Sequence, residues 1–137
     1  MMKRRTRMNV ETALAGEAMA ALRYQLFAEQ ARREGYPEVA ALFASTGLEE
    51  RREHFRELAA ELGLIRSTGD NLRMALRGEI AEHRSLYPRF AAEAQEDGEE
   101  AVARRFVELE GDEGRHAGLL RQQLEDLEVA DLEVVGG

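Results

Sequence analysis

Glutamate and histidine side chains lie in this sequence at positions where a helix would present apolar residues to a core. Glu113 and His116 are three residues apart, so on a helix both side chains project from one face, one turn apart. A carboxylate and an imidazole in this arrangement can bind one metal ion or bridge two. Because this spacing alone is a weak signal in an acidic chain, its weight depends on the rest of the sequence.

Three other apolar stripes of helical period contain the same residue types. Glu17 and Glu79 each replace an apolar residue on one stripe, and Glu50 and His54 lie together on another. One Glu from each of two helices, with a Glu/His pair from each of the other two, is the ligand pattern of helical bundles that bind two iron ions. The four stripes together are therefore a much stronger signal than any one of them.

Buried carboxylates need a positively charged partner, because an unpaired buried ion is destabilising by several kcal/mol. Arginines near these residues in the sequence lie off the apolar stripes; they are Arg23, Arg51, Arg52 and Arg115. Metal ions are the simplest remaining partner for the carboxylates.

The pair formed by Glu50 and His54 departs from the three-residue spacing. Arg51 stands where the carboxylate is expected, and Glu50 is four residues before the histidine. A π-bulge would widen this turn to about 4.4 residues and return Glu50 to the face of His54. Glu49 and Glu53 are alternative ligands from the same helix.

Four further side chains near the stripes each have two explanations. Glu82 follows Glu79 by one turn and is either an additional ligand or a solvent-exposed residue. His83 is either a hydrogen-bond partner of the site or a surface histidine. Tyr24 and Tyr87 either donate a hydrogen bond to a ligating carboxylate or are aromatic residues of the core.

Composition favours an all-α fold of one domain. The 137 residues are 44% hydrophobic, with two Pro and no Trp, and are rich in Ala, Leu, Glu and Arg. Helical periodicity predicts four helices, at roughly 9–34, 37–62, 70–96 and 98–126. Asn9 and Asp70 are candidate N-caps, and Gly35 and Gly63 are candidate helix stops. Short connections predict two antiparallel hairpins in a four-helix bundle.

The second half of the chain repeats the first. Residues 13–17 return as 75–79 at an offset of 62, residues 28–43 return as 91–106 at an offset of 63, and His54 matches His116 at 62 again. The change in offset predicts one extra residue in the third helix, where Pro88 favours a kink or π-bulge. It predicts another in the second helix, between Phe43 and His54.

Several function classes are disfavoured. The net charge of −8 argues against nucleic acid as a ligand, and the basic run at residues 3–7 reads as a solvated tail. Without cysteine there is no thiolate ligand or disulfide. No apolar stretch reaches the about 20 residues of a membrane span or forms a secretory signal, which predicts a cytoplasmic protein with no membrane partner. The predicted organisation is a tail at 1–8, a helical domain at 9–127 and a second tail at 128–137.

At this point the sequence resembles the rubrerythrin family. The segments that carry the likeness are AGE at 15–17, RY at 23–24, FAE at 27–29, EH at 53–54, GE at 78–79 with Glu82, YP at 87–88, FA at 90–91 and EGRH at 113–116. The resemblance implies a ferritin-like fold and a di-iron site whose ligands are Glu17, Glu50, His54, Glu79, Glu82, Glu113 and His116.

The implied activity is reduction of hydrogen peroxide, or dioxygen, with oxidation of ferrous iron in oxidative stress defence. The rubredoxin domain of typical members is absent from this sequence, so an external donor such as a rubredoxin-like protein is expected to supply electrons. Manganese or zinc could occupy the same ligands. Two alternatives remain open: an iron storage or encapsulated cargo protein, and a metal-free helical interaction module.

The connection between the second and third helices predicts a swapped dimer. Residues 63–70 span at most about 25 Å when fully extended, whereas a helix of about 24 residues is about 36 Å long. By resemblance, a ferritin-like chain must cross the bundle at this connection. We therefore expect the first hairpin of one chain to pack on the second hairpin of another, with shared iron sites.

Overall fold

The computed structural model describes the backbone of residues 1–136 and the side chains of residues 1–131. Over this backbone the chain is all-α and contains no strand. It divides into two compact units, Met1–Ile65 and Arg66–Gly137. Each unit is an antiparallel helical hairpin, as the short connections predicted.

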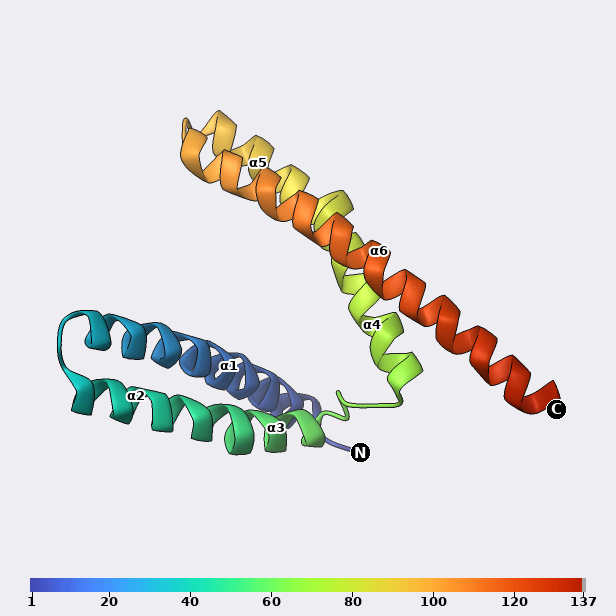
Figure 1. Cartoon of the computed structure of the whole chain (residues 1–137), viewed down its shortest axis with the longest axis horizontal. Helices are drawn as coiled ribbons and strands as arrows, with labels where there is room; N and C mark the ends of the chain where they lie inside the picture. The colour runs from blue at the N-terminus through green and yellow to red at the C-terminus, as the bar shows by residue number, and fades with distance from the viewer. Residues whose placement is uncertain (137) are drawn as a thin grey trace. The chain divides into compact units, whose positions relative to one another are not determined.

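The first unit pairs one long helix with a second, composite helix. Helix α1 spans Arg4–Arg33. The second consists of α2 (Pro37–Glu49), the π-helical turn η1 (Glu50–His54) and α3 (Phe55–Glu61) in direct succession. Figure 1 shows α1 lying along α2 and α3. Gly35 makes the turn between them with a φ of 83°, a left-handed conformation that glycine adopts without strain.

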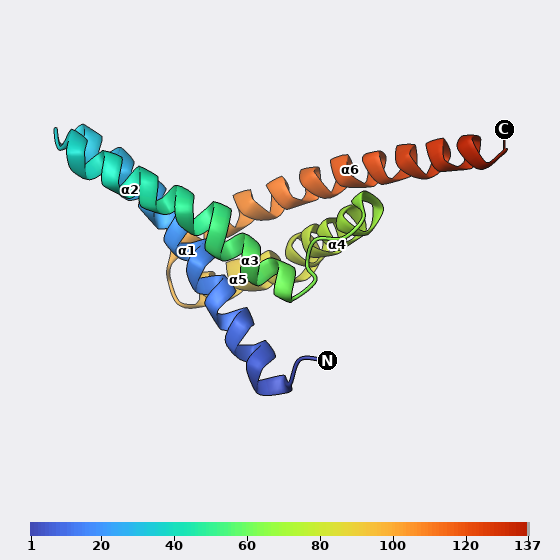
Figure 2. The same cartoon turned by 90° about the horizontal axis from the view of Figure 1, so that it is seen from below.

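The second unit has the same plan with the composite helix first. Helix α4 (Thr68–Ala81), the π-helical turn η2 (Glu82–Leu86) and α5 (Tyr87–Glu96) are followed by α6 (Glu100–Gly136). Helix α6 passes α5 and then α4, and its C-terminal end projects beyond the start of α4 (Figures 1 and 2). An ion pair of 3.0 Å between Arg73 and Glu128 joins α4 to α6.

The helix ends differ from the predicted ones at three places. Helix α1 begins at Arg4, because no Gly or Pro separates residues 4–8 from the helix, so Asn9 is not its cap. Ser67 caps α4, since its hydroxyl accepts the Asp70 N–H at 3.2 Å, and Asp70 is not the cap. Helix α6 continues to Gly136 instead of ending near 126.

These boundaries bear on the two predicted tails without testing the domain division. Most of residues 1–8 and nearly all of 128–137 belong to helices. Residue 137 and the side chains of 132–137 lie outside the described part of the chain. The division into a 1–8 tail, a 9–127 domain and a 128–137 tail stays a prediction.

Both extra residues that the repeat offset predicted are present as π-helical turns. The N–H of Phe55 bonds to the carbonyl of Glu50, and the N–H of Tyr87 to that of Glu82, each across five residues. Pro88 is the second residue after the second turn, in the first turn of α5. The wider turns let the flanking α-helices keep their phase, so the apolar stripe continues on one face.

Aromatic clusters show that the two hairpins share one packing plan. Tyr24 stacks on Phe43 at 5.8 Å between ring centroids and an interplanar angle of 24°. Tyr87 stacks on Phe106 at 6.0 Å and the same angle. A further phenylalanine, Phe27 or Phe90, lies 5.4 Å from the stacked phenylalanine in each unit. The duplication read from the sequence is therefore a duplication of three-dimensional structure.

Neither hairpin buries a large side chain fully among the described residues. The buried apolar residues are seven alanines and Leu62. Large apolar side chains stay exposed: Phe27 at 43%, Val39 at 44% and Leu42 at 64%. Two helices alone cannot enclose a core, so each hairpin keeps an apolar face that needs a partner. No helix in the described part of the chain is both long and apolar enough to cross a membrane.

Candidate metal centre

Three side chains of the first unit converge from two helices. Glu17 projects from α1, and Glu50 and His54 project from η1, with ligand atoms within 4.8 Å of one another. His54 Nδ1 lies 2.8 Å from Glu50 Oε2 and 3.8 Å from Glu17 Oε2. We call these three residues the first cluster. Glu50 is its least exposed side chain, at 17%.

The second unit has an equivalent group on α4 and α6. Glu79, Glu113 and His116 also bring ligand atoms within 4.8 Å of one another, and we call them the second cluster. His116 Nδ1 lies 2.9 Å from Glu113 Oε2 and 3.5 Å from Glu79 Oε2. The order of side chains and the distances follow those of the first cluster closely.

The π-helical turn η1 accounts for this agreement. Glu113 and His116 are three residues apart on the α-helix α6, whereas Glu50 and His54 are four residues apart across η1. In an ordinary α-helix, the side chain four places along the chain has rotated past the face of the first. The wider π-helical turn has more residues per turn, so the fourth side chain returns to that face. The bulge predicted in this helix therefore has the predicted effect, and Glu50 is the carboxylate that contacts His54.

The two carboxyl groups of each cluster shift one another's pKa in opposite directions. A hydrogen bond with Glu50 raises the pKa of Glu17, and burial adds to the effect. The same bond lowers the pKa of Glu50 below its ordinary value, and His54 lowers it further. Of this pair, Glu17 is therefore the carboxyl group that holds a proton more readily, and Glu50 is the one that ionises more readily. In the second cluster Glu113 raises the pKa of Glu79 in the same way, and Glu79 lowers that of Glu113.

The donor atoms of both clusters fit a metal ion. Glu79 Oε2 is buried and has no hydrogen-bond partner, although an unpaired buried oxygen is destabilising. A hydrogen bond with Glu50 raises the pKa of His54, so the carboxylate favours the charged form of this imidazole. A cation bound among these oxygens would stabilise the ionised carboxylates and give Glu79 Oε2 the partner that it lacks. Carboxylate oxygens with one imidazole nitrogen suit iron, manganese or zinc.

Glu82 is not brought into the second cluster. It lies in η2, half-buried, and lines a surface hollow of about 480 Å³ together with Ser85 and Arg89. Its negative charge is close enough to raise the pKa values of Glu79 and Tyr87. Among the predicted ligands it is the one that would have to move toward the cluster to bind the same ion.

The two predicted tyrosines take their places in the aromatic stacks. Neither the Tyr24 nor the Tyr87 hydroxyl makes a hydrogen bond to the described residues, so the expected bond to a carboxylate is not formed in this structure. Burial, followed by the charges of Glu82, Glu113 and Glu79, raises the pKa of Tyr87. Its hydroxyl is therefore kept protonated near the second cluster.

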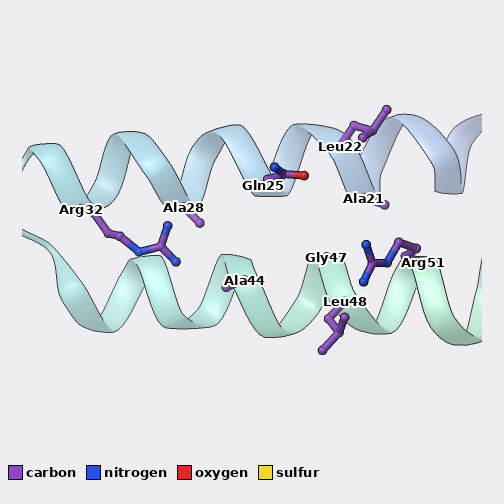
Figure 3. Close-up of a pocket in the computed structure, with 9 residues that line it drawn as sticks. All are labelled: Ala21, Leu22, Gln25, Ala28, Arg32, Ala44, Gly47, Leu48 and Arg51. Atoms are coloured by element: carbon purple, nitrogen blue, oxygen red, sulfur yellow. The ribbon is translucent and has the colours of Figure 1, made fainter.

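A groove between α1 and α2 lies apart from the first cluster. Its volume is about 190 Å³, and none of the three cluster residues lines it. Figure 3 shows Arg32 and Arg51 reaching between the two helices from opposite ends of the groove, with Ala28, Ala44 and Gly47 along it. Arg51 therefore lines this groove and is not part of the first cluster.

His83 makes a contact that the sequence left open. Its Nδ1 lies 2.9 Å from the main-chain carbonyl of Glu110 on α6. Because a carbonyl only accepts, the imidazole donates through Nδ1. The signal that could have revealed this contact is Gly114, inside the Glu-x-x-His segment, where a Cβ would lie 2.9 Å from the His83 ring.

Four long helices in two duplicated hairpins, each with a Glu/Glu/His cluster, define a ferritin-like protein of the carboxylate type. Comparison with known proteins agrees with this class. The model of the rubrerythrin family matches residues 8–124. The chain belongs to the rubrerythrin family.

Three relatives illustrate the similarity. The chain is 36% identical over 125 residues to a rubrerythrin of Porphyromonas gingivalis, covering 82% of this chain and 62% of that protein. It is 36% identical over 118 residues to a rubrerythrin of Nitratidesulfovibrio vulgaris, covering 77% and 61%. A nigerythrin of the same organism is 30% identical over 136 residues, covering 90% and 67%. The chain thus spans about three fifths of the length of the first two relatives.

Proposed function

We propose that this chain is a non-haem di-iron protein that reduces hydrogen peroxide while ferrous iron is oxidised, as part of a defence against oxidative stress. The observation that carries the proposal is the pair of matched clusters, each with two carboxylates and an imidazole Nδ1 turned toward one another. Membership of the rubrerythrin family supports it. Seven residues would hold two iron ions: Glu17, Glu50, His54, Glu79, Glu82, Glu113 and His116.

Two ferrous ions would supply the two electrons for cleavage of the O–O bond, and two protons complete two molecules of water. The chain's own contribution is to hold the ligands and to keep protons nearby. Each histidine is aligned by its carboxylate neighbour, at 2.8 Å in the first cluster and 2.9 Å in the second. The raised pKa of Tyr87 keeps a hydroxyl proton beside Glu79 and Glu113. An external donor, such as a rubredoxin-like protein, would return the electrons.

The assembly we propose is a dimer in which hairpins are exchanged. Each unit contributes a cluster of three residues, and three ligands are too few for two iron ions. A first unit and a second unit must therefore come together to form one site. The connection between α3 and α4 is residues 62–67, which span at most about 21 Å when extended. The composite helix of 25 residues is about 38 Å long. One chain therefore cannot cross a bundle of this length, whereas two chains can complete two bundles.

The exposed apolar faces support this pairing. Phe27, Val39 and Leu42 lie open on the first unit, and Val102 lies 45% exposed on the second at the position of Val39 in the repeat. Burial of such residues stabilises by about 25 cal/mol per Å² of apolar surface. The hairpin of a second copy has the matching duplicated face and would cover these residues.

The deciding experiment combines metal analysis with peroxide oxidation. Anaerobic titration of the apoprotein should reach two ferrous ions per chain, and stopped-flow mixing should consume one peroxide for each iron pair. Uptake of many iron atoms per chain would instead indicate storage or a cargo role. A protein whose thermal unfolding does not respond to ferrous ions would indicate a metal-free helical module.

A further inference from the structure

His83 connects the two ligand-bearing segments of the second unit. It immediately follows Glu82 in η2 and comes four residues after Glu79. On the other side, its ring contacts the segment of α6 between Glu110 and Gly114, which leads directly into the second cluster. One side chain therefore spans from the turn that carries Glu79 and Glu82 to the turn that carries Glu113.

Two contacts hold the ring in this place. Nδ1 donates to the Glu110 carbonyl at 2.9 Å, and it also lies 3.4 Å from the Glu110 carboxylate. On the α6 side the ring packs against bare backbone, since a Cβ on residue 114 would lie 2.9 Å from both Cε1 and Nδ1 of His83. A glycine in the interior of a helix is unfavourable, so space for the ring is a physical reason for Gly114.

The first unit has no such connection. The repeat places Ala21, Gly47 and Arg51 where the second unit has His83, Glu110 and Gly114. There the two helices approach directly, because a Cβ on Gly47 would lie 3.0 Å from Tyr24 Cβ and 3.2 Å from the Ala21 carbonyl. The imidazole bridge thus belongs only to the unit that also carries Glu82.

We propose that His83 is a positioning residue for the metal centre, which it serves by fixing the backbone of α6 at Glu110–Gly114 against η2. This inference rests on the proposed metal-binding function and assigns to it a residue that is not a ligand. The hydrogen bond fixes where the turn that carries Glu113 and His116 lies along the axis of α4. The ring fixes the distance between α4 and α6 at that turn.

The hydrogen bond is tested with His83→Phe, which keeps a ring of similar size and removes the N–H donor. The full-length apoprotein is titrated with Co²⁺, and the affinity and number of bound ions are read from the visible spectrum, with thermal unfolding of the apoprotein measured in parallel. We expect the affinity for at least one of the ions to fall about tenfold, with little change in the unfolding temperature. Unchanged affinity and stoichiometry would overturn the positioning role.

The ring contact is tested by a double-mutant cycle of His83→Ala and Gly114→Ala. Gly114→Ala alone should lower both the unfolding temperature and the Co²⁺ affinity, because the new methyl group meets the ring. In the His83→Ala background the same change should raise the unfolding temperature, since alanine is the better helix former. The matched control is Gly118→Ala on the same helix, where no atom lies within 4 Å of the new Cβ.

The two proposals fail in different ways. If Gly114→Ala behaves like Gly118→Ala in both backgrounds, the ring contact is wrong whatever the protein binds. If the wild-type protein binds neither Co²⁺ nor Fe²⁺, the proposed function is wrong, and His83 can then only be a packing residue, which the coupling in the apoprotein would still reveal.

Discussion

His54 Nδ1 lies 2.8 Å from Glu50 Oε2 although the two residues are four apart, because a π-helical turn carries them. The equivalent contact in the second unit, between His116 and Glu113, is 2.9 Å long across three residues of ordinary α-helix. The protein thus reaches one geometry with two different spacings, and the extra residue is absorbed inside the turn that bears the candidate ligands.

Removing that residue should be tolerated. Deletion of Arg52, an exposed residue of η1, leaves a three-residue Glu/His spacing that an α-helix presents on one face. We expect the flanking helices to keep their phase, the unfolding temperature to stay the same or rise, and Co²⁺ binding to persist, as measured by circular dichroism and visible titration. Deletion of Ser45 in the regular helix α2 is the control and should abolish binding, because it rotates one flank by about 100°.

Metal binding should release protons, and more of them at low pH. His54 has a pKa raised above its ordinary value of 6.5 by its hydrogen bond with Glu50, so the imidazole must lose a proton before it can ligate. Affinity should therefore fall as the pH falls through this raised pKa. Isothermal titration in buffers of different ionisation enthalpy should show greater proton release near pH 6 than near pH 9. In His54→Ala the difference should shrink; an unchanged difference would place the titrating group elsewhere.

The apoprotein should gain stability when Glu79 loses its charge. The pKa of Glu79 is raised, first by the hydrogen bond with Glu113 and then by burial, so the ionised form is disfavoured in the folded state. Ionisation of Glu79 therefore destabilises the folded protein. The destabilisation begins as the pH rises above the ordinary pKa of 4.5 and is complete once the pH exceeds the raised pKa. At neutral pH, Glu79→Gln should therefore raise the unfolding temperature by a few degrees in the presence of a chelator.

The same variant should lose its response to metal. Wild-type protein at about one hundred times the dissociation constant gains about 2.7 kcal/mol from a bound ion, and the variant should gain much less. Glu93→Gln is the matched control, because Glu93 is exposed and its ion pair with Arg89 is long, at 3.8 Å. A variant that is less stable than wild type without metal would contradict the assignment of Glu79 as an uncompensated charge.

A longer connection should convert the proposed dimer into a monomer. Inserting about twelve Gly and Ser residues after Leu64 would let one chain cross a bundle of about 38 Å. Light scattering coupled to gel filtration should then report a dimer for the natural chain and a monomer for the variant, with equal Co²⁺ bound per chain. A monomeric natural chain that binds two ions would show that no exchange of hairpins is needed.

Much of this structure follows from patterns that are local in the sequence. Helical period and the short connections predicted the two hairpins. Gly35 and Gly63, which were predicted as helix stops, both have positive φ. The repeat predicted both π-helical turns, because an inserted residue changes the offset between the two copies of a repeated stripe. The same reasoning favoured Glu50 and left Glu49 and Glu53 as alternatives, and the structure places Glu50 against His54.

The remaining features depend on contacts that no local pattern encodes. Asp70 is a residue type that often caps helices. Ser67, however, lies where its hydroxyl can accept a free N–H group of the first turn of α4. Glu82 has the right spacing from Glu79, but η2 begins at this residue and directs it to the surface hollow. His83 reaches Glu110 across twenty-seven residues, a partner that only the packing of α4 against α6 brings into range.

The positions of η1 and η2 make the two halves of the chain unequal. The first lies in the second helix of its hairpin and the second in the first helix of its hairpin, so the two inserted residues do not occupy equivalent positions of the repeat. In the first half the wider turn carries the histidine of the cluster, and in the second half it begins at Glu82, one turn after Glu79. A substitution at one position of the repeat is therefore not a copy of the same substitution at the other.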